Sequence, residues 1–368
     1  MDKKNQRPEF HGSDLEKIAA YYHIPASEIP GIIKFGANVN PLGLSESVKN
    51  DLAGHLDIIS SYPDRNYTSL KKTIGEYCHI SPEHIVVGNG STELISLLIS
   101  QRQAKKALVV GPTYSEYERE LALTGGTITE YNLKEDLNFQ LDMQDFFASM
   151  ADDVDLLILC NPNNPTSSAI KNHDMKQILT FCKERNIFVM IDETYVEFAP
   201  DVAEITAIPL TDEFDNVMVI RGVSKFYAAP GLRFGYGITS NHDFLEALLI
   251  HQNPWSLNSV AAYAGEHMFK DSAYQQATRQ LICSERGRMY TAIQNIPAFK
   301  AYKPYANFIL VRILKEGITS FDIFEAAIKE RMMIRDCSSF KSLDGEYIRF
   351  CIMNPEDNTH LLKLLEQF

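Results

Sequence analysis

The chain has 368 residues, 45% of them hydrophobic, and a formal net charge of −13. This length allows two domains, and the composition is that of an ordinary globular protein. The acidic balance argues against nucleic acid as a partner, because binding a phosphate backbone requires clustered lysine and arginine. A small anionic ligand stays compatible with this charge, since a local basic pocket can bind it.

The six cysteines are scattered, without a C-x-x-C pair or a metal-type cluster, so no metal site is expected. The first residues, MDKKNQRPEFHGSD, contain no apolar stretch that could act as a secretion signal. Apolar runs such as LLILC are strand-sized and too short to span a bilayer. We therefore expect a cytoplasmic protein without a membrane segment.

From about residue 69 to 240, short β-branched runs alternate with helical periodicity, which is typical of a doubly wound α/β sheet. Helices are predicted at 91–101, 114–126 and 173–186. Strands are predicted at 85–90, 106–112, 127–133, 156–162, 187–192, 216–222 and 234–240.

The character of the sequence changes after residue 240, where long helical patterns dominate. A strand at 307–313 and two short strands that contain arginine are expected among these helices, which together predict a small α+β domain. The helices are predicted at 242–252, 259–269, 280–296, 320–332 and 360–368.

Four polar motifs lie at predicted strand ends, which is where α/β proteins bind ligands. They are GNGSTE (88–93), NPNNPTS (161–167), MIDETYVEF (190–198) and SKFYAAPGLRFGY (224–236). The first opens a helix and suits a phosphate, and the aspartate of the third ends a buried strand, where it requires a cation or a donor. Each motif alone also fits a structural role: a capped helix start, a plain turn, an N-cap aspartate or a solvated lysine.

Two arginines, Arg335 and Arg349, lie in segments that otherwise predict buried strands. A buried guanidinium without an anionic partner is very costly. We expect both side chains to bind an anion. Internal salt bridges to aspartate or glutamate are the alternative.

Taken together and in this order, the four motifs resemble those of the fold-type I pyridoxal-phosphate (PLP) enzymes, from about Phe35 to the C-terminus. The resemblance implies a fold-type I aminotransferase-like α/β fold with PLP as the cofactor. Its expected catalytic residues are Lys225, which would form the Schiff base, Asp192, which would pair with the pyridine nitrogen, and Tyr114, which would stack on the ring. Asp192 would keep the ring an electron sink, and the freed lysine would move protons at Cα.

The same resemblance implies a division of the chain into three parts. Residues 1–35 would form an arm that packs with the small domain. Residues 36–250 would form the large PLP-binding domain with its doubly wound, mostly parallel sheet, and residues 251–368 the small C-terminal α+β domain.

The resemblance also implies the rest of the cofactor site. Asn164 and Tyr195 would bond the phenolic oxygen of PLP. Tyr62, in SYPD, would reach the phosphate of the neighbouring subunit, which implies a homodimer with active sites shared across its interface. The cofactor phosphate would otherwise be bound by Gly90, Ser91, Thr92, Ser224 and Arg233.

Two positions depart from the family pattern. Ser167 stands where relatives usually have glycine, which puts the geometry of that turn in doubt. Gly222 stands where relatives often carry serine or threonine, so the affinity for the cofactor is expected to be lower than usual.

The substrate site is likewise implied by resemblance. Arg349 would bind the α-carboxylate and Arg335 a distal phosphate, so the substrate would be an amino compound with a second anion. His11 and Gly12, in HGSD, would reach towards that phosphate, although this motif is equally well explained as an N-cap box. Asn38, in FGANVN, is a further expected contact of the substrate.

Two branches of the family compete, the histidinol-phosphate aminotransferases and the threonine-phosphate decarboxylases of cobalamin biosynthesis. The segments KFYAAPGLRFGY, FGANVNPLG, GNGSTE and RDCSSFKSLDGEYIR are more similar to the decarboxylases. We therefore predict decarboxylation of L-threonine phosphate or L-serine phosphate, which differ by one methyl group worth only about 1–3 kcal/mol in a pocket. The products would be amino-alcohol phosphates for the cobalamin nucleotide loop.

Two alternatives stay open at this point. The first is amino transfer from histidinol phosphate to 2-oxoglutarate, which would use the same lysine, aspartate and arginines. The second is an effector-binding module without catalysis. It is disfavoured because Lys225 and Asp192 are both present and because the residues before the predicted large domain are too few for a DNA-binding domain.

Overall fold

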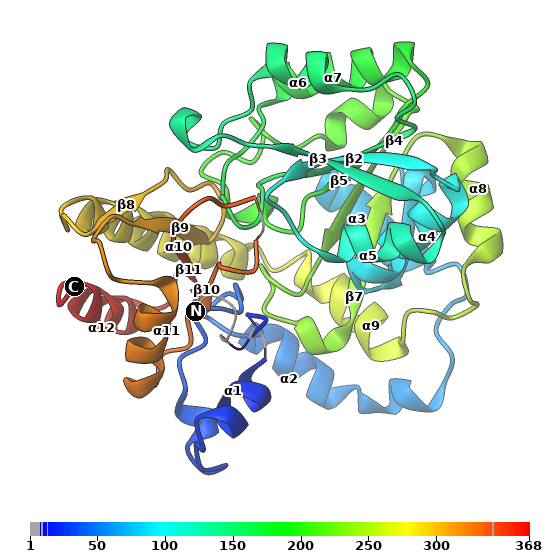
Figure 1. The fold of residues 1–368 in the computed structure, drawn as a ribbon. Coiled ribbons are helices and arrows are strands. Elements are labelled where there is room, and N and C mark those ends of the chain that lie inside the picture. The colour runs from blue at the N-terminus through cyan, green and yellow to red at the C-terminus, as the bar shows by residue number, and fades with distance from the viewer. Residues whose placement is uncertain (1–7, 9, 13, 341) are drawn as a thin grey trace.

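The computed structural model describes residues 8, 10–12, 14–340 and 342–368. Ser13 of the HGSD motif, Lys341 and most of the first nine residues of the predicted arm lie outside the described residues. Within them the strands form two separate sheets, each covered by its own helices (Figure 1).

The large sheet has seven strands in the order β1-β7-β6-β5-β4-β2-β3. β7 is antiparallel to both of its neighbours, and the remaining pairs are parallel, so the sheet is mostly parallel as predicted. The carboxyl ends of β1, β4, β5 and β6 therefore lie at one edge, and each is followed by one of the four polar motifs. The strands are β1 (Ile85–Asn89), β2 (Lys106–Gly111), β3 (Thr127–Asn132), β4 (Leu156–Cys160), β5 (Phe188–Asp192), β6 (Val217–Gly222) and β7 (Phe234–Ile238).

Helices cover both faces of the large sheet, because successive strand residues point to opposite sides and both sides are apolar. Val86 and Val87 of β1, for example, belong to two different hydrophobic clusters. The Val86 side packs against α4 (Gly90–Arg102), α5 (Glu116–Leu123) and α8 (His242–His251). The Val87 side packs against α3 (Thr68–Cys78), α6 (Met143–Ser149), α7 (Asn172–Glu184) and α9 (Ser259–Met268).

The small sheet is antiparallel, with the strand order β10-β11-β9-β8. Its strands are β8 (Phe299–Ala301), β9 (Phe308–Ile313), β10 (Arg335–Asp336) and β11 (Tyr347–Cys351). Two helices pack on this sheet, the long α10 (Ser272–Gln294) and α11 (Ser320–Lys329). α12 (Pro355–Leu365) packs against both of these helices. The last helix begins earlier than predicted, because Asn354 caps it and Pro355 occupies its first turn.

The described residues of the arm contact the small sheet and its helices rather than the large sheet. Ile33 forms a parallel bridge with Met332, and the Cys351 N–H donates to the carbonyl of Phe35 at 2.8 Å. The ring of Phe10 stacks on Phe324 of α11 at 5.7 Å. These contacts agree with an arm that packs on the small α+β unit.

The predicted domain boundary at residue 251 does not coincide with the division between the helices of the two sheets. α9 packs against α3 and β7 of the large sheet, whereas α10 contacts β8 of the small one. The three-part division of the chain therefore stays a prediction. The remaining elements are α1 (Leu15–Tyr21), α2 (Glu46–Gly54) and the short 3₁₀ helices η2 (Ile29–Gly31), η3 (Leu56–Ser60), η4 (Pro82–His84), η5 (Glu135–Leu137), η6 (Val196–Phe198), η7 (Ile208–Asp212) and η8 (Pro230–Leu232).

Across the described residues, no helix combines the length and apolar character that crossing a bilayer requires. The cytoplasmic location stays a prediction from the sequence.

Candidate active site

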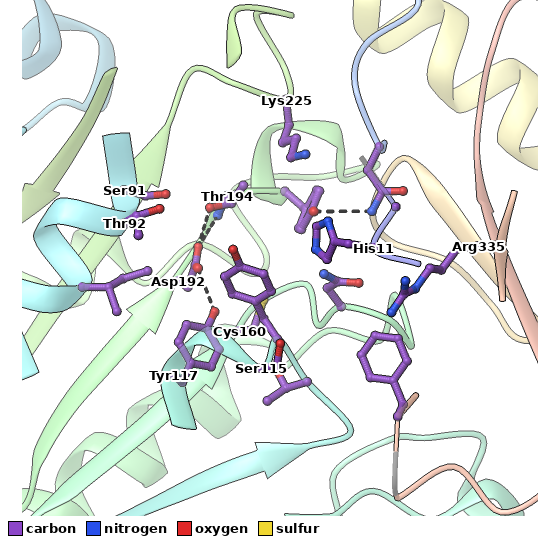
Figure 2. Close-up of a pocket in the computed structure, with 18 of the residues that line it drawn as sticks. His11, Ser91, Thr92, Ser115, Tyr117, Cys160, Asp192, Thr194, Lys225 and Arg335 are labelled. Atoms are coloured by element: carbon purple, nitrogen blue, oxygen red, sulfur yellow. Dashed lines mark hydrogen bonds between the residues drawn. The ribbon is translucent and has the colours of Figure 1, made fainter. Parts of the chain in front are cut away.

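A cavity of about 680 Å³ lies between the carboxyl edge of the large sheet and the small sheet. Each of the four strand-end motifs contributes to its wall, as do the two arginines of the small sheet. Figure 2 shows Lys225, Asp192, His11 and Arg335 gathered in this cavity from separate elements. The predicted site residues that line it are His11, Gly12, Asn38, Gly90, Ser91, Thr92, Tyr114, Asn164, Asp192, Tyr195, Ser224, Lys225, Arg233, Arg335 and Arg349.

At one end of the cavity, the first turn of α4 meets Arg233. Gly90 has a φ of +79°, and a Cβ there would lie 2.4 Å from Nη2 of Arg233. A Cβ on Gly235 would lie 2.4 Å from the backbone nitrogen of Ser91. The two glycines therefore let a guanidinium and a helix N-terminus approach one another, an arrangement that suits a phosphate. The helix begins at Gly90, with Asn89 as its N-cap, one residue before the predicted start at residue 91.

Asp192 ends β5 in the floor of the cavity and is 5% exposed. Its Oδ1 accepts hydrogen bonds from the backbone N–H and the hydroxyl of Thr194, and its Oδ2 accepts from the hydroxyl of Tyr117 at 2.7 Å (Figure 2). Burial raises the pKa of Asp192, while these donors act in the opposite direction. A cation beside this carboxylate, such as a protonated pyridine nitrogen, would stabilise its charged form.

Lys225 follows β6 and donates from Nζ to the carbonyl of Ala37 at 2.8 Å. Burial, followed by the positive charges of Arg349 and Arg233, lowers its pKa to about 8. A larger fraction of the amine is therefore neutral near physiological pH than for an exposed lysine, which makes it a better nucleophile towards an aldehyde.

Arg335 and Arg349 are directly paired residues on β10 and β11, so their side chains emerge on the same face of the small sheet. Arg349 donates to Oδ1 of Asn164 and to the carbonyl of Gly36. Arg335 donates to the hydroxyl of Ser339 at 2.7 Å. Among the described residues, neither guanidinium forms an ion pair with a carboxylate, so the alternative of internal salt bridges is not supported there.

Several buried polar atoms around the cavity have no hydrogen-bond partner among the described residues: Nε of Arg349, Oδ1 of Asn38 and Oγ1 of Thr113. Nδ2 of Asn38 donates to the hydroxyl of Tyr195 at 3.4 Å. Buried polar groups are normally paired. These atoms therefore fit a polar ligand that brings both donors and acceptors.

The N-terminal segment lines the cavity beside Arg349. A Cβ on Gly12 would lie 2.2 Å from the carbonyl oxygen of Gly36 and 3.3 Å from Nη2 of Arg349. Only glycine allows the backbone to pass here without displacement. His11 lies in the wall beside it, and burial together with the charge of Arg335 lowers the pKa of its imidazole.

Tyr62 is the one predicted site residue that does not line the cavity of its own chain. Its side chain is 81% exposed, and its ring lies 4.9 Å from that of Trp255. The predicted contact of Tyr62 with a neighbouring subunit is outside what a single chain contains and stays a prediction.

The model of the family described as aminotransferase class I and II matches residues 30–365. The chain belongs to this family. Its members are PLP-dependent enzymes, so the expected fold class, cofactor and enzymatic nature are confirmed.

Individual relatives cover nearly the whole chain. The threonine-phosphate decarboxylase of Salmonella typhimurium is 35% identical over 96% of this chain and 95% of its own length. The adenosylcobalamin biosynthesis bifunctional protein CobDQ of Leptospira interrogans is 32% identical over 96% of this chain and 40% of its own length. Among solved structures, the histidinol-phosphate aminotransferase from Clostridium acetobutylicum has a TM-score of 0.83 at 33% identity and covers 90% of this chain and 97% of that one.

The residues present fit PLP as this family binds it. Lys225 would hold its aldehyde carbon, Asp192 its pyridine nitrogen, and the cradle of Gly90, Ser91 and Arg233 its phosphate. Tyr114 lies in the same cavity, with its ring edge-on to that of Tyr117 at 5.6 Å. The roles of the individual residues stay predictions.

Sequence reasoning missed Tyr117 and Thr194. Tyr117 lies three residues after Tyr114 at the start of α5, so both rings face the cavity, and this spacing was a usable signal. Thr194 lies two residues after Asp192, a position from which a backbone N–H commonly donates to an aspartate. As for Gly222, a Cβ there would meet Oγ of Ser91 at 3.6 Å, an ordinary contact, so nothing in its surroundings requires glycine.

We expect the rate at which the PLP-free protein captures PLP to depend on the charge of Lys225. Below the pKa of about 8 the rate should fall about tenfold per pH unit, because only the neutral amine attacks the aldehyde, and above it the rate should level off. Arg349→Gln removes a charge that lowers this pKa and should move the midpoint to higher pH. Stopped-flow absorbance, recorded across a pH series, measures the rate of PLP capture and the midpoint of its pH dependence. Arg335→Gln is the matched control, and an equal midpoint in Arg349→Gln and wild type would contradict the explanation.

Tyr117→Phe is expected to weaken PLP binding at equilibrium. The change removes one donor to Asp192, raises the pKa of that carboxyl further and disfavours its charged form. A hydrogen bond to a charged group contributes about 1.5–3 kcal/mol, which corresponds to roughly a tenfold or larger increase in Kd. Tyr131→Phe removes a tyrosine–aspartate hydrogen bond outside the cavity and should leave Kd unchanged. Equal Kd values for the two variants would rule out this role of Tyr117.

Proposed function

We propose that this chain decarboxylates an O-phospho-amino acid, L-threonine phosphate or L-serine phosphate, to the corresponding amino-alcohol phosphate for the cobalamin nucleotide loop. The observation that carries the proposal is the cross-strand pair Arg335 and Arg349, two buried guanidiniums that lack a carboxylate partner among the described residues. The similarity to threonine-phosphate decarboxylase and to a cobalamin biosynthesis protein, both over 96% of this chain, supports the choice of reaction.

The two arginines favour a substrate that carries two anions close together. Directly opposed residues of an antiparallel pair have Cα atoms only about 4.5–5.5 Å apart. Threonine phosphate carries a carboxylate on Cα and a phosphate on the oxygen of Cβ, so one small molecule can satisfy both guanidiniums. Histidinol phosphate carries a single anionic group and pairs with one of them, so in amino transfer the second would be used only by the acceptor 2-oxoglutarate.

Each residue of the site has a defined task in this reaction. Arg349 binds the α-carboxylate, and Arg335, with Ser339 and His11 beside it, binds the distal phosphate. PLP, when bound, supplies the electron sink that makes a bond to Cα breakable. As the carboxylate leaves as carbon dioxide, a proton must be added at Cα, and the amine of Lys225 is the group that delivers it.

Amino transfer is the second candidate, and the similarity to a histidinol-phosphate aminotransferase structure favours it. The two reactions differ in which bond at Cα stands perpendicular to the cofactor ring. A decarboxylase holds the carboxylate bond in that direction, and an aminotransferase holds the hydrogen there. The orientation in which Arg349 holds the substrate carboxylate decides which of these two bonds takes that direction.

The decisive measurement is carbon dioxide release from L-threonine phosphate and L-serine phosphate, with PLP present and no keto acid. We expect release by the wild type and none by Lys225→Ala. Arg335→Gln should lower kcat/KM for the phosphorylated substrate about 10- to 150-fold, because charge-assisted hydrogen bonds to the phosphate are lost. Amino transfer from histidinol phosphate to 2-oxoglutarate without carbon dioxide release would establish the aminotransferase instead.

We further propose a homodimer in which Tyr62 completes the phosphate site of the neighbouring subunit. Tyr62 is accompanied on the surface by Leu56, Ile59 and Trp255, which are 53%, 65% and 40% exposed. The indole of Trp255 donates to the carbonyl of Pro63 and its ring lies beside that of Tyr62, while Leu56 and Ile59 belong to η3, which ends two residues before Tyr62. An apolar area of this kind is typical of a protein interface.

Mixing two inactive variants tests the shared site. Tyr62→Phe should bind PLP weakly, and Lys225→Ala should not form the covalent link. In mixed dimers one site regains both residues, so about a quarter of all sites should recover tight PLP binding, as seen in the visible absorption at limiting PLP. Mixing Tyr62→Phe with a chain that carries both substitutions is the control. A monomer in sedimentation, or equal recovery in the control, would refute the shared site.

A further inference from the structure

Ser167 ends the NPNNPTS turn and has a backbone conformation that suits glycine. Its φ is +59°, in the left-handed region that residues with a Cβ rarely adopt, and its side chain is fully buried. A serine in this strained conformation points to a use for its hydroxyl.

The hydroxyl of Ser167 accepts hydrogen bonds from the segment that leads into the small sheet. Its Oγ accepts from the backbone N–H of Ala306 at 2.9 Å and from that of Tyr305 at 3.2 Å. The carbonyl of Ser167 also accepts from the Tyr305 N–H, at 2.8 Å. Glycine would keep this last bond and lose the other two. The N–H of Ala306, a fully buried residue, would then have no acceptor among the described residues.

The two segments joined by this hydroxyl both reach the active site. On one side, Asn164 of the same turn accepts a hydrogen bond from Arg349. On the other side, Asn307 donates to the carbonyl of Asn38 at 3.1 Å, and the ring of Phe308 lies 5.3 Å from the guanidinium of Arg349. Segment 305–308 therefore lies between Ser167 and the arginine that faces the cavity.

Segment 305–308 is also held from the opposite direction. Arg286 of α10 donates to the carbonyls of Tyr305 and Ala306 at 2.8 and 2.9 Å. The carbonyls of Tyr305 and Ala306 are thus bound from the side of α10, and the N–H groups of the same two residues are bound by Ser167 from the side of the large sheet. The next two residues are anchored to the small sheet, because the carbonyl of Asn307 accepts from the N–H of Ile352 at 2.7 Å and Phe308 pairs with Cys351. Loss of the Ser167 hydroxyl therefore weakens the attachment of residues 305 and 306 to the large sheet.

We propose that Ser167 is a positioning residue, whose hydroxyl fixes segment 305–308 against the NPNNPTS turn and so holds Arg349 at the depth at which it meets a substrate carboxylate. The role of Arg349 as the carboxylate site rests on the proposed function. The fixing of the segment by the hydroxyl does not, and the two parts are measured separately.

Hydrogen exchange of the holoenzyme, followed by mass spectrometry, measures the first part. Ser167→Ala keeps the Cβ and removes the hydroxyl, and Ser167→Gly removes the hydroxyl and the strain together. In both variants the amide of residue 306 should exchange at least about tenfold faster, because this buried N–H has lost its acceptor, whereas the Tyr305 amide keeps its bond to the carbonyl of residue 167. Ser168→Ala is the control, since the hydroxyl of Ser168 bonds to Thr166 within the same turn. If Ser167→Ala does not fold, Ser167→Gly still decides. Wild-type exchange in Ser167→Gly would overturn the proposal.

Ligand binding measures the second part without turnover. The probe is 3-phosphoglycerate, which has a carboxylate and a phosphate but no amine, with binding read from the visible absorption of the bound cofactor. Both Ser167 variants should bind it about five- to tenfold more weakly, at unchanged affinity for PLP. Faster exchange with unchanged affinity for the probe would reduce Ser167 to a structural role and overturn the positioning. If the wild type does not bind the probe, the carboxylate role of Arg349 fails and the positioning with it, whatever the exchange result.

Discussion

Arg335 and Arg349 occupy opposed positions on neighbouring strands of the small sheet, where two like charges repel one another. Burial adds to this cost, and it contributes with Arg349 to lowering the pKa of Arg335. The same charge of Arg349 lowers the pKa of Lys225 across the cavity. A fold that keeps two guanidiniums without a carboxylate partner in this place is least stable when the cavity lacks an anion, so binding of an anion there, such as the proposed substrate, would relieve an unfavourable interaction already present in the protein. The nucleophilicity of the lysine is one consequence of this arrangement.

The two ends of the cavity are built on different principles. The end proposed for the cofactor is made from backbone: Gly90 admits Arg233, and Gly235 lets β7 approach the N-terminus of α4, so its shape follows from the chain path. The substrate end is made from side chains on a short strand pair and from an N-terminal segment packed over them. A family can change its substrate by altering the second end and keep its chemistry in the first.

Many of the residues that sequence analysis located, though not Arg335, Arg349 or the N-terminal ones, share a position shortly after a buried parallel strand. Such strands place their carboxyl ends together, so Asp192, Asn164 and Lys225 could be assigned to one site without knowledge of the loops. The contact of Tyr117 with Asp192 depends on where α5 begins relative to β5, which periodicity does not fix. From the sequence, Ser167 could be seen only as a departure from the pattern of the turn. The backbone N–H groups that donate to its hydroxyl lie 138 and 139 residues further along the chain, so their contact could not be predicted. Tyr62 depends on a second copy, which one sequence does not contain.

The close passage of Gly12 over Gly36 has a consequence for redesign of the enzyme. The N-terminal segment lies so near to the backbone beneath it that a single added carbon would overlap the carbonyl of Gly36. Any side chain introduced at position 12 must therefore displace this backbone, whose carbonyl also accepts a hydrogen bond from Arg349. A library that varies the cavity should keep glycine at position 12 and take its diversity from the side chains of the walls.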